Sequence, residues 1–243
     1  MHAITIENLS KKYNDRIAVD RLSLIINKGE LLAFLGFNGA GKTTTIKMLS
    51  GLVTPTSGDA VIFGKRITNE MDEIKPYLNI SPQETAIAPN LTVFENLIFI
   101  AEVYGMKSIN AKSKAIDMMT KFDLVDRKND KAKKLSGGLK RRLSLAMALI
   151  TEPKIVFLDE PTLGLDVRAR RDLWKVIKEL KGEVTIILTT HYLEEVNALA
   201  DRIAIIDKGK LLVNGTLIEL QEKTGLNSLE DIFLSLTEGD IVK

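Results

Sequence analysis

A phosphate-binding loop is predicted for residues 36–43, which read Gly36-Phe37-Asn38-Gly39-Ala40-Gly41-Lys42-Thr43. They fit the Walker A pattern G-x-x-x-x-G-K-[ST] without a mismatch. Glycines let backbone N–H groups surround phosphate oxygens. Lys42 would reach the β- and γ-phosphates, and the Thr43 hydroxyl would bind Mg²⁺. The alternative is a glycine-rich turn with an incidental lysine.

The residues on either side of the loop favour a strand and a helix. Before it, Leu31-Leu32-Ala33-Phe34-Leu35 is a short apolar run typical of a buried strand. After it, Thr44 to Ser50 favours a helix that ends at Gly51. This order points backbone N–H groups and the positive end of the helix dipole at one place. The context therefore favours phosphate binding over an incidental turn.

Two adjacent acids follow a second apolar run. Residues 154–158 predict a buried strand, which ends in Asp159-Glu160-Pro161. Side chains alternate along a strand, so we expect the two carboxylates on opposite sides of the chain. Asp159 is then suited to hold Mg²⁺, directly or through water, and Glu160 to take a proton from an attacking water. A plain turn at a strand end is the alternative, and a Walker A loop in the same chain argues against it.

A second helix start with free N–H groups is predicted at Leu135-Ser136-Gly137-Gly138. Ser136 can cap this helix, and the glycines leave N–H groups exposed at its positive end. One γ-phosphate hardly needs two such cradles from one chain. We therefore expect a dimer in which each chain offers this cradle to the nucleotide of its partner. A simple Ser-Gly helix cap is the alternative.

Length and composition limit the classes of protein. The chain has 243 residues, 45% of them hydrophobic and 27% charged, which suits one large globular domain or two small ones. A net charge of +2 favours neither nucleic acid nor a strongly anionic surface as a partner. The chain has no cysteine, which excludes disulfides and thiolate metal sites. Without a signal-peptide pattern or an uncharged apolar run of about 20 residues, we expect a cytoplasmic chain that reaches membranes only through another protein.

Strands alternate with helices, which predicts an α/β fold with a largely parallel sheet. Further strands are expected at Ile4–Glu7, Leu22–Ile26, Gly58–Gly64 and Val184–Thr189, and a hairpin at Ile203–Val213. Apolar residues at helical spacing predict helices in 91–104, 110–122 and 139–150. A further helix is expected with Leu173, Ile177 and Leu180 on one face, and another over 229–236 with Ser228 as its cap. Trp174 is interpreted as a core or interface residue rather than a ligand platform.

Walker A, Leu-Ser-Gly-Gly and Asp-Glu-Pro, in this order and spacing, resemble the ATP-binding subunit of an ABC transporter over almost the whole chain. The resemblance implies a P-loop NTPase (RecA-like) core with a mostly parallel sheet, an N-terminal antiparallel β subdomain and an inserted α-helical subdomain. It implies a single ABC ATPase domain over 1–243. The parts are 1–85 and 151–215 for the β subdomain and core, 86–150 for the helical subdomain with the signature motif, and 216–243 for a C-terminal helical tail.

The resemblance also implies roles for single residues. Tyr13 matches the aromatic that stacks on adenine, Gln83 the Q-loop glutamine, and His191 the switch histidine that positions the γ-phosphate. Taken alone, they could be a surface aromatic, a loop residue and a packed histidine. The predicted catalytic residues are Lys42, Gln83, Glu160 and His191. The predicted ATP contacts are Tyr13, Phe37, Asn38, Gly39, Ala40, Gly41, Lys42, Thr43, Thr44, Ser136, Gly137 and Gly138, and the predicted Mg²⁺ ligands are Thr43, Gln83 and Asp159.

The signature usually reads Leu-Ser-Gly-Gly-Gln, and here Leu139 replaces the glutamine. The runs 136–143 and 229–233 are similar to ABC-2 type exporters, a branch that includes drug, sodium and antibiotic-resistance exporters. This branch implies an ABC-2 type membrane permease as partner, a homodimer or heterodimer, no nucleic acid, and a place on the inner face of the cell membrane. The transported substrate is not readable from these residues.

Two other functions fit parts of the pattern. One is a soluble ABC-type ATPase that acts on ribosomes or DNA, but such proteins usually have two cassettes or a long coiled coil, and this chain has one Walker A and no sustained heptads. The other is a nucleotide-binding regulator without catalysis. Intact Lys42, Asp159, Glu160 and His191 argue against it.

Overall fold

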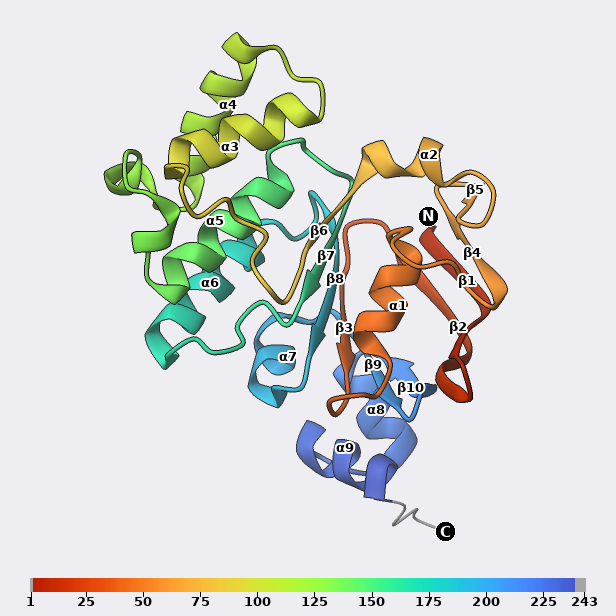
Figure 1. The fold of residues 1–243 in the computed structure, drawn as a ribbon. Coiled ribbons are helices and arrows are strands. Elements are labelled where there is room, and N and C mark those ends of the chain that lie inside the picture. The colour runs from red at the N-terminus through yellow and green to blue at the C-terminus, as the bar shows by residue number, and fades with distance from the viewer. Residues whose placement is uncertain (1, 239–243) are drawn as a thin grey trace.

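The computed structural model describes residues 2–238 and contains two sheets and a group of helices (Figure 1). The smaller sheet has the strand order β2-β1-β4-β5 and the larger one β10-β9-β3-β8-β7-β6. Neighbours in the smaller sheet are antiparallel. Neighbours in the larger sheet are parallel except β9 and β10. The predicted fold class, with an N-terminal antiparallel sheet and a mostly parallel core sheet, is confirmed.

The smaller sheet is built around a long hairpin. Its strands are β1 (His2–Tyr13), β2 (Arg16–Asn27), β4 (Ser57–Ile62) and β5 (Lys65–Arg66). The strands predicted at Ile4–Glu7 and Leu22–Ile26 are confirmed, but each is the inner part of a strand of 12 residues. The outer parts have register shifts and exposed polar residues, so their apolar alternation is interrupted.

The larger sheet carries the buried strands. They are β3 (Leu31–Leu35), β6 (Leu78–Ser81), β7 (Ile155–Asp159), β8 (Thr185–Thr190), β9 (Arg202–Asp207) and β10 (Lys210–Gly215). The predicted buried runs and the β9–β10 hairpin are confirmed. Strand β6, at the edge of the sheet, was not predicted. It has only four residues, too few for a periodic pattern.

Helices cover the larger sheet and extend away from it. They are α1 (Lys42–Leu49), α2 (Met71–Ile74), α3 (Val93–Val103), α4 (Ser108–Lys121), α5 (Gly137–Leu149), α6 (Val167–Glu179), α7 (Leu193–Leu199), α8 (Leu217–Thr224) and α9 (Leu229–Glu238). Short 3-10 turns are η1 (Lys75–Tyr77), η2 (Val125–Arg127) and η3 (Ala132–Lys134). Within residues 2–238, no helix combines the length and the apolar character that crossing a membrane requires.

The predicted helices are confirmed to within a few residues at their ends. Ser228 caps α9 as expected, because its hydroxyl accepts a hydrogen bond of 3.0 Å from the backbone N–H of Asp231. Helices α3 and α4, with the start of α5, form a helical subdomain beside the larger sheet (Figure 1). The exact subdomain boundaries given above stay a prediction.

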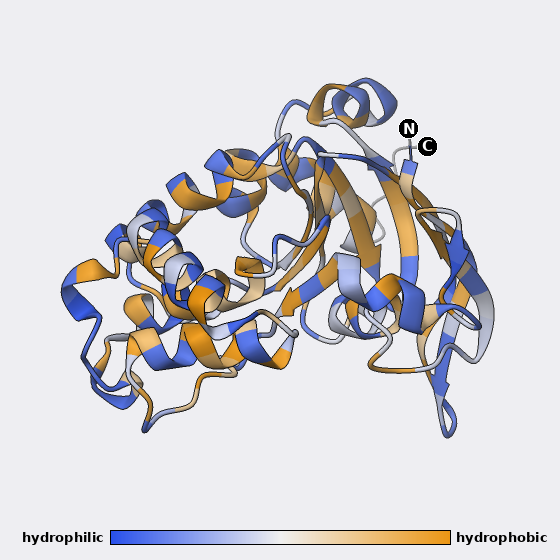
Figure 2. Cartoon of the chain, turned by 90° about the horizontal axis from the view of Figure 1, so that it is seen from above, coloured by the Kyte–Doolittle hydropathy of each residue, from blue (hydrophilic) through white to orange (hydrophobic). Residues whose placement is uncertain are grey.

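Strand β3 divides the hydrophobic core into two parts. Leu31, Ala33 and Leu35 face the cluster formed with the helical subdomain and α6 to α9. Leu32 and Phe34 face the cluster formed with α1 and the smaller sheet. Strands of the larger sheet are mainly orange in Figure 2, whereas most helices show both colours. A strand buried on both faces reads as a continuous apolar run, which is why β3 was predictable.

Candidate functional site

The loop between β3 and α1 is pressed closely against neighbouring backbone. Gly41 has a φ of 108°, and a Cβ atom there would lie 2.5 Å from the carbonyl oxygen of Ala18 in β2. At Gly36 a Cβ atom would lie 2.3 Å from the carbonyl oxygen of Ile206 in β9. Only glycine fits at either position. The glycines of the motif therefore hold the loop against β2 and β9 and place the start of α1.

Lys42 is buried beneath this loop, with 5% of its surface exposed. Its ammonium donates hydrogen bonds to the carbonyl oxygens of Gly36 at 2.7 Å and Phe37 at 3.1 Å. The same Nζ lies 3.4 Å from Oε1 of Glu160. Burial lowers the pKa of Lys42, and the nearby carboxylates of Glu160 and Asp159 oppose this effect. The loop thus holds a buried cation between its own carbonyl oxygens and the carboxylate of Glu160.

Glu160 follows the end of β7 in a left-handed conformation, with a φ of 47°. Its N–H is held by Thr189, at 3.1 Å from both the carbonyl and the hydroxyl oxygen. The strand has already ended at Asp159, so a left-handed turn, not the expected strand alternation, sets the direction of the Glu160 side chain. Oε2 of Glu160 lies 2.9 Å from Nδ1 of His191. Apart from this contact, neither atom has a hydrogen-bond partner among residues 2–238.

Asp159 faces the start of α1. Its Oδ1 accepts hydrogen bonds from the hydroxyls of Thr43 at 2.9 Å and Thr189 at 2.5 Å. Within residues 2–238, no group of three or more His, Cys, Asp or Glu side chains could hold a metal ion. Mg²⁺ commonly uses one or two carboxylates and completes its shell with water and substrate phosphates. The hydroxyl and carboxylate at Thr43 and Asp159 fit this kind of site.

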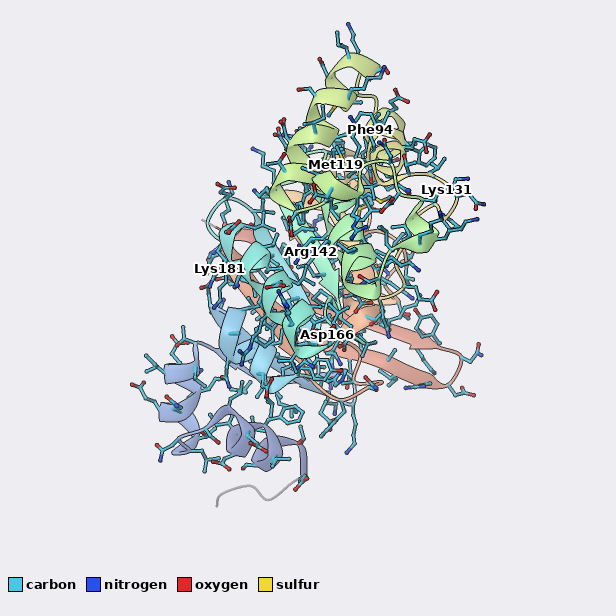
Figure 3. All side chains as sticks on the ribbon, turned by 90° about the vertical axis from the view of Figure 1, so that its left-hand side faces the viewer. Phe94, Met119, Lys131, Arg142, Asp166 and Lys181 are labelled. Carbon is cyan, nitrogen blue, oxygen red and sulfur yellow. The ribbon has the colours of Figure 1, made fainter. Side chains whose placement is uncertain are left out.

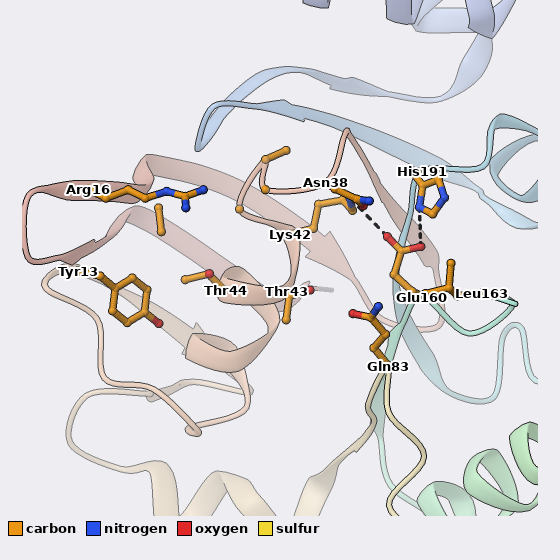
Figure 4. A pocket seen from close by; sticks show the side chains of 14 residues that line it. Tyr13, Arg16, Asn38, Lys42, Thr43, Thr44, Gln83, Glu160, Leu163 and His191 are labelled. Atoms are coloured by element: carbon orange, nitrogen blue, oxygen red, sulfur yellow. Dashed lines mark ion pairs between the residues drawn. The ribbon is translucent and has the colours of Figure 1, made fainter.

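A pocket of about 460 Å³ opens over the loop (Figure 4), a size within the range of small-molecule sites. Tyr13 lies at one end of it, and Glu160 and His191 at the other. The side chain of Gln83 points toward Thr43 and Glu160. The pocket is lined by Tyr13, Arg16, Ala18, Asn38, Gly39, Ala40, Gly41, Lys42, Thr43, Thr44, Gln83, Glu160, Leu163 and His191. Most of the predicted site residues therefore meet in one cavity.

Some predicted residues lie elsewhere. Phe37 does not line the pocket, and its ring packs 4.9 Å from the ring of Phe233 in α9. Asp159 is buried behind the lining. Ser136–Gly138 are also absent from the lining and form the N-terminus of α5, where the Ser136 hydroxyl accepts a hydrogen bond from the N–H of Leu139 at 3.4 Å. The predicted Ser136 cap is thus present and lies outside the pocket of its own chain, and phosphate binding by this helix start stays a prediction.

Several residues at the site were not predicted. Arg16 and Leu163 line the pocket. The hydroxyl of Thr189 accepts a hydrogen bond from the N–H of Glu160 and donates one to the carboxylate of Asp159. The strand partner of Arg16 is Tyr13, so its closeness to the predicted aromatic was a usable signal. Leu163 lies three residues after Glu160, so its closeness to the two predicted acids was also a usable signal. Arg141, described below, has no comparable signal, because only the folded chain shows where it points.

A second buried acid lies beside the site. Glu195 in α7 is fully buried, and its Oε1 accepts a hydrogen bond of 3.1 Å from the indole N–H of Trp174. Its Oε2 has no hydrogen-bond partner among residues 2–238. Burial raises the pKa of Glu195 and outweighs the hydrogen bond with Trp174, which acts to lower it. Trp174 packs against the core, as expected, and its N–H has a buried acceptor.

Replacing this acid should change how stability depends on pH. Between the pKa of Glu195 in the unfolded chain and its higher pKa in the folded chain, only the folded chain keeps the proton. The free energy of unfolding therefore falls as the pH rises through this range. Glu195→Gln removes the ionisable group. The unfolding temperature of the variant should exceed that of the wild type by a few degrees near pH 8, and the difference should shrink toward pH 5. Thermal unfolding across this range tests it, with Glu194→Gln as the exposed control. Parallel profiles for Glu195→Gln and wild type would contradict it.

Comparison with known proteins identifies the family. Residues 19–163 match the family model described as ABC transporter. The linearmycin resistance ATP-binding protein LnrL of Bacillus subtilis is 39% identical over 94% of this chain and 74% of its own length. The daunorubicin/doxorubicin resistance ATP-binding protein DrrA of Streptomyces peucetius is 40% identical over 93% of this chain and 69% of its own. ABC transporter A family member 6 of Dictyostelium discoideum is 45% identical over 91% of this chain, which spans only 14% of that protein.

Solved structures agree with this relation. An ATP-binding subunit of an ABC transporter superposes with a TM-score of 0.86 at 28% identity, covering 96% of this chain and 99% of the other. The dimeric, post-hydrolysis ATP-binding cassette MJ0796, bound to ADP and Pi, has a TM-score of 0.79 at 25% identity, covering 88% and 98%. The chain therefore belongs to the ABC transporter family, as an ATP-binding subunit and an ABC-type ATPase.

Proposed function

We propose that this chain is the ATP-driven motor of an exporter, and that it acts through a separate ABC-2 type permease. Two copies, or one copy and a close relative, enclose two ATP molecules between them. One observation carries the proposal. A single pocket gathers Lys42, Gln83, Glu160 and His191, whereas Ser136–Gly138 lie outside it and are free to complete the pocket of a partner. The resistance proteins LnrL and DrrA support export.

The pocket residues divide the binding of ATP among them. The Tyr13 ring stacks on the base, an interaction worth about 1–3 kcal/mol for a single base. Lys42, Thr44 and the N–H groups of the loop bind the phosphates. Thr43, Asp159 and Gln83 would hold Mg²⁺, which would supply positive charge beside the phosphates.

Glu160 is placed to act as the general base. The attacking water gives a proton to its carboxylate, while the water oxygen bonds to the γ-phosphorus and the bond to the leaving oxygen of ADP breaks. Among residues 2–238, Oε2 of Glu160 has no polar contact besides His191, so it has capacity to accept a hydrogen bond from water. His191 then positions the γ-phosphate beside this base. Fixing the Glu160 backbone through Thr189 limits the directions that the carboxylate takes.

The second cradle completes the site from the partner. Ser136 caps α5, and the glycines after it leave N–H groups at the positive end of the helix. A Cβ atom at Gly138 would lie 3.1 Å from the Cβ atom of Ala169, so a small residue is favoured there. Leu139 in place of the usual glutamine removes an amide but keeps the cap and both glycines. Closure of the dimer on ATP, and its opening after hydrolysis, would drive the permease.

A groove near the helical subdomain suits a segment of the permease. It lies between the end of α1, η1, β6 and the end of α3, and it is lined by Ser50, Gly51, Leu52, Asp72, Lys75, Pro76, Leu78, Asn79, Ile80 and Tyr104. Leu52 and Tyr104 of this lining are exposed, and Val103, the residue before Tyr104, is exposed as well. Tyr104 donates a hydrogen bond of 2.7 Å to Asn79 in β6, so the groove is joined to the strand that leads to Gln83.

Capture of the partner tests the proposed function. Tagged Glu160→Gln chain with ATP should recover a multi-span membrane protein in stoichiometric yield from detergent-solubilised membranes of the native host. Val103→Asp, at a position 62% exposed beside the groove, should lower this recovery at least about tenfold, because a buried charge at an interface is costly. Ile218→Asp, 67% exposed on α8, is the control and should recover the permease fully. Ribosomal or DNA-associated proteins instead of a permease would overturn the proposal.

A further inference from the structure

A buried arginine lies directly beneath the two acids. Arg141, in α5, is 4% exposed. Its Nε donates to the carbonyl oxygen of Pro161 at 2.6 Å, and its Nη2 donates to those of Asp159 at 2.9 Å and Glu160 at 2.5 Å. These three carbonyls belong to the turn that aims the Glu160 carboxylate. The guanidinium therefore holds the carbonyl oxygens of this turn, while Thr189 holds the N–H of Glu160.

The same guanidinium reaches a second segment of the site. Its Nη1 donates to the carbonyl oxygens of Pro82 at 2.6 Å and Gln83 at 3.1 Å. Arginine has five N–H donors in a planar fork, and here five carbonyl oxygens accept from it. Lysine, with three donors on one nitrogen, cannot span both segments. One side chain thus joins α5 to the backbones of Glu160 and Gln83.

The next residue provides a contrast. Arg142, labelled in Figure 3, pairs with two acids instead, at 2.9 Å from Asp123 in the turn after α4 and 3.4 Å from Asp172 in α6. It contacts neither the turn after β7 nor the segment of Gln83. The two arginines share a helix and a charge, but only Arg141 is connected to the pocket.

We propose that Arg141 is a positioning residue that couples the two nucleotide sites of the dimer. This rests on the proposed function, in which the N-terminus of α5 binds the nucleotide held by the partner. Arg141 lies five residues after Ser136 on this helix. Docking of α5 on the partner's nucleotide would shift the guanidinium, and with it the backbones of Glu160 and Gln83 in its own chain. Each site would therefore reach full activity only when the other is occupied.

Mixed dimers separate the two sites. One copy carries Lys42→Met, which weakens ATP binding, and the other copy stays intact at its pocket. ATP is kept at a concentration that fills only the intact pocket. In this dimer the α5 helix of the intact copy faces the empty site. Turnover per intact site should fall at least about tenfold below that of the wild-type homodimer, because the helix that positions Glu160 is not docked. An unchanged rate would overturn the coupling without any variant of Arg141.

The Arg141→Lys variant tests the residue itself. The Arg141→Lys homodimer should hydrolyse ATP, per site, about as slowly as the mixed dimer with an intact Arg141. Emptying one site of an Arg141→Lys dimer should change the rate of the other site less than about twofold. The ATP concentration for half-maximal binding should stay within about twofold of wild type, since Arg141 hydrogen-bonds backbone carbonyl oxygens at Gln83 and after β7 rather than atoms of the phosphate loop. Arg142→Lys should keep the wild-type rate and the wild-type dependence on the second site.

The outcomes distinguish the two proposals. A wild-type homodimer that hydrolyses no ATP would refute the proposed function itself. The coupling alone would be refuted if the wild type hydrolyses ATP and the turnover of each site in Arg141→Lys still depends fully on ATP in the other site. A loss of ATP binding and thermal stability in Arg141→Lys, while its second-site dependence persists, would assign Arg141 a purely structural role and also refute the coupling.

Discussion

Glu160→Gln should lower ATP turnover at least about a hundredfold while leaving ATP binding intact, because a positioned general base contributes about 10² to 10⁴ in rate. The amide keeps the size of the side chain but cannot take a proton from water. Its oxygen can still accept from Lys42, whose Nζ lies 3.4 Å from Oε1 in the wild type. Phosphate release over time measures turnover, and a fluorescent ATP analogue measures binding.

The same variant should accumulate as a closed dimer when ATP is present, because the step that opens the dimer follows hydrolysis. Size-exclusion chromatography with and without ATP detects this change. Glu194→Gln is a matched control, since Glu194 is an exposed acid of α7 outside the pocket. Turnover of Glu160→Gln at the wild-type rate would assign the proton transfer to another group.

Lys42→Met should weaken ATP binding by about 10- to 100-fold, since hydrogen bonds to charged groups contribute about 1.5–3 kcal/mol. The wild-type ammonium is 5% exposed and already held in the loop by two carbonyl oxygens, so little ordering remains for it on binding. Methionine fills a similar volume without the charge. The variant also leaves the buried carboxylate of Glu160 without its nearest cation.

Calorimetric titration with ATP gives the binding constant directly. Lys47→Met is the matched control, because Lys47 lies on the exposed side of the same helix. Its affinity for ATP should equal that of the wild type. Equal affinities for Lys42→Met and Lys47→Met would show that the loop lysine contributes nothing to phosphate binding.

Local sequence patterns predicted the elements that hold the nucleotide. The loop at 36–43 and the buried strands β3 and β7 were recognisable because a complete motif and continuous apolar runs coincide there. Strand β6 and helix α7 were missed, since four and seven residues are too few for a reliable period. Both position site residues, because Gln83 follows β6 and His191 precedes α7.

The burial of Arg141 and the conformation of Glu160 depend on tertiary contacts and could not be predicted from the sequence. Lys140, Arg141 and Arg142 read as a basic stretch of a surface helix, and nothing in their order indicates that the middle one is buried. The conformation of Glu160 was equally out of reach. Its left-handed turn depends on hydrogen bonds from Arg141 and to Thr189, which lie 19 and 29 residues away in the chain.

Helix α1 lies between the two sheets, and this position should set the order in which the molecule opens. Its amides can exchange with deuterium only when a sheet separates from it, so they should be among the slowest of the chain to exchange. Helix α4 has an exposed outer side, including Ile109 and Ile116, and should open first. The phosphate loop is thus attached to the most persistent part of the fold, and local melting of the helical subdomain would leave it intact.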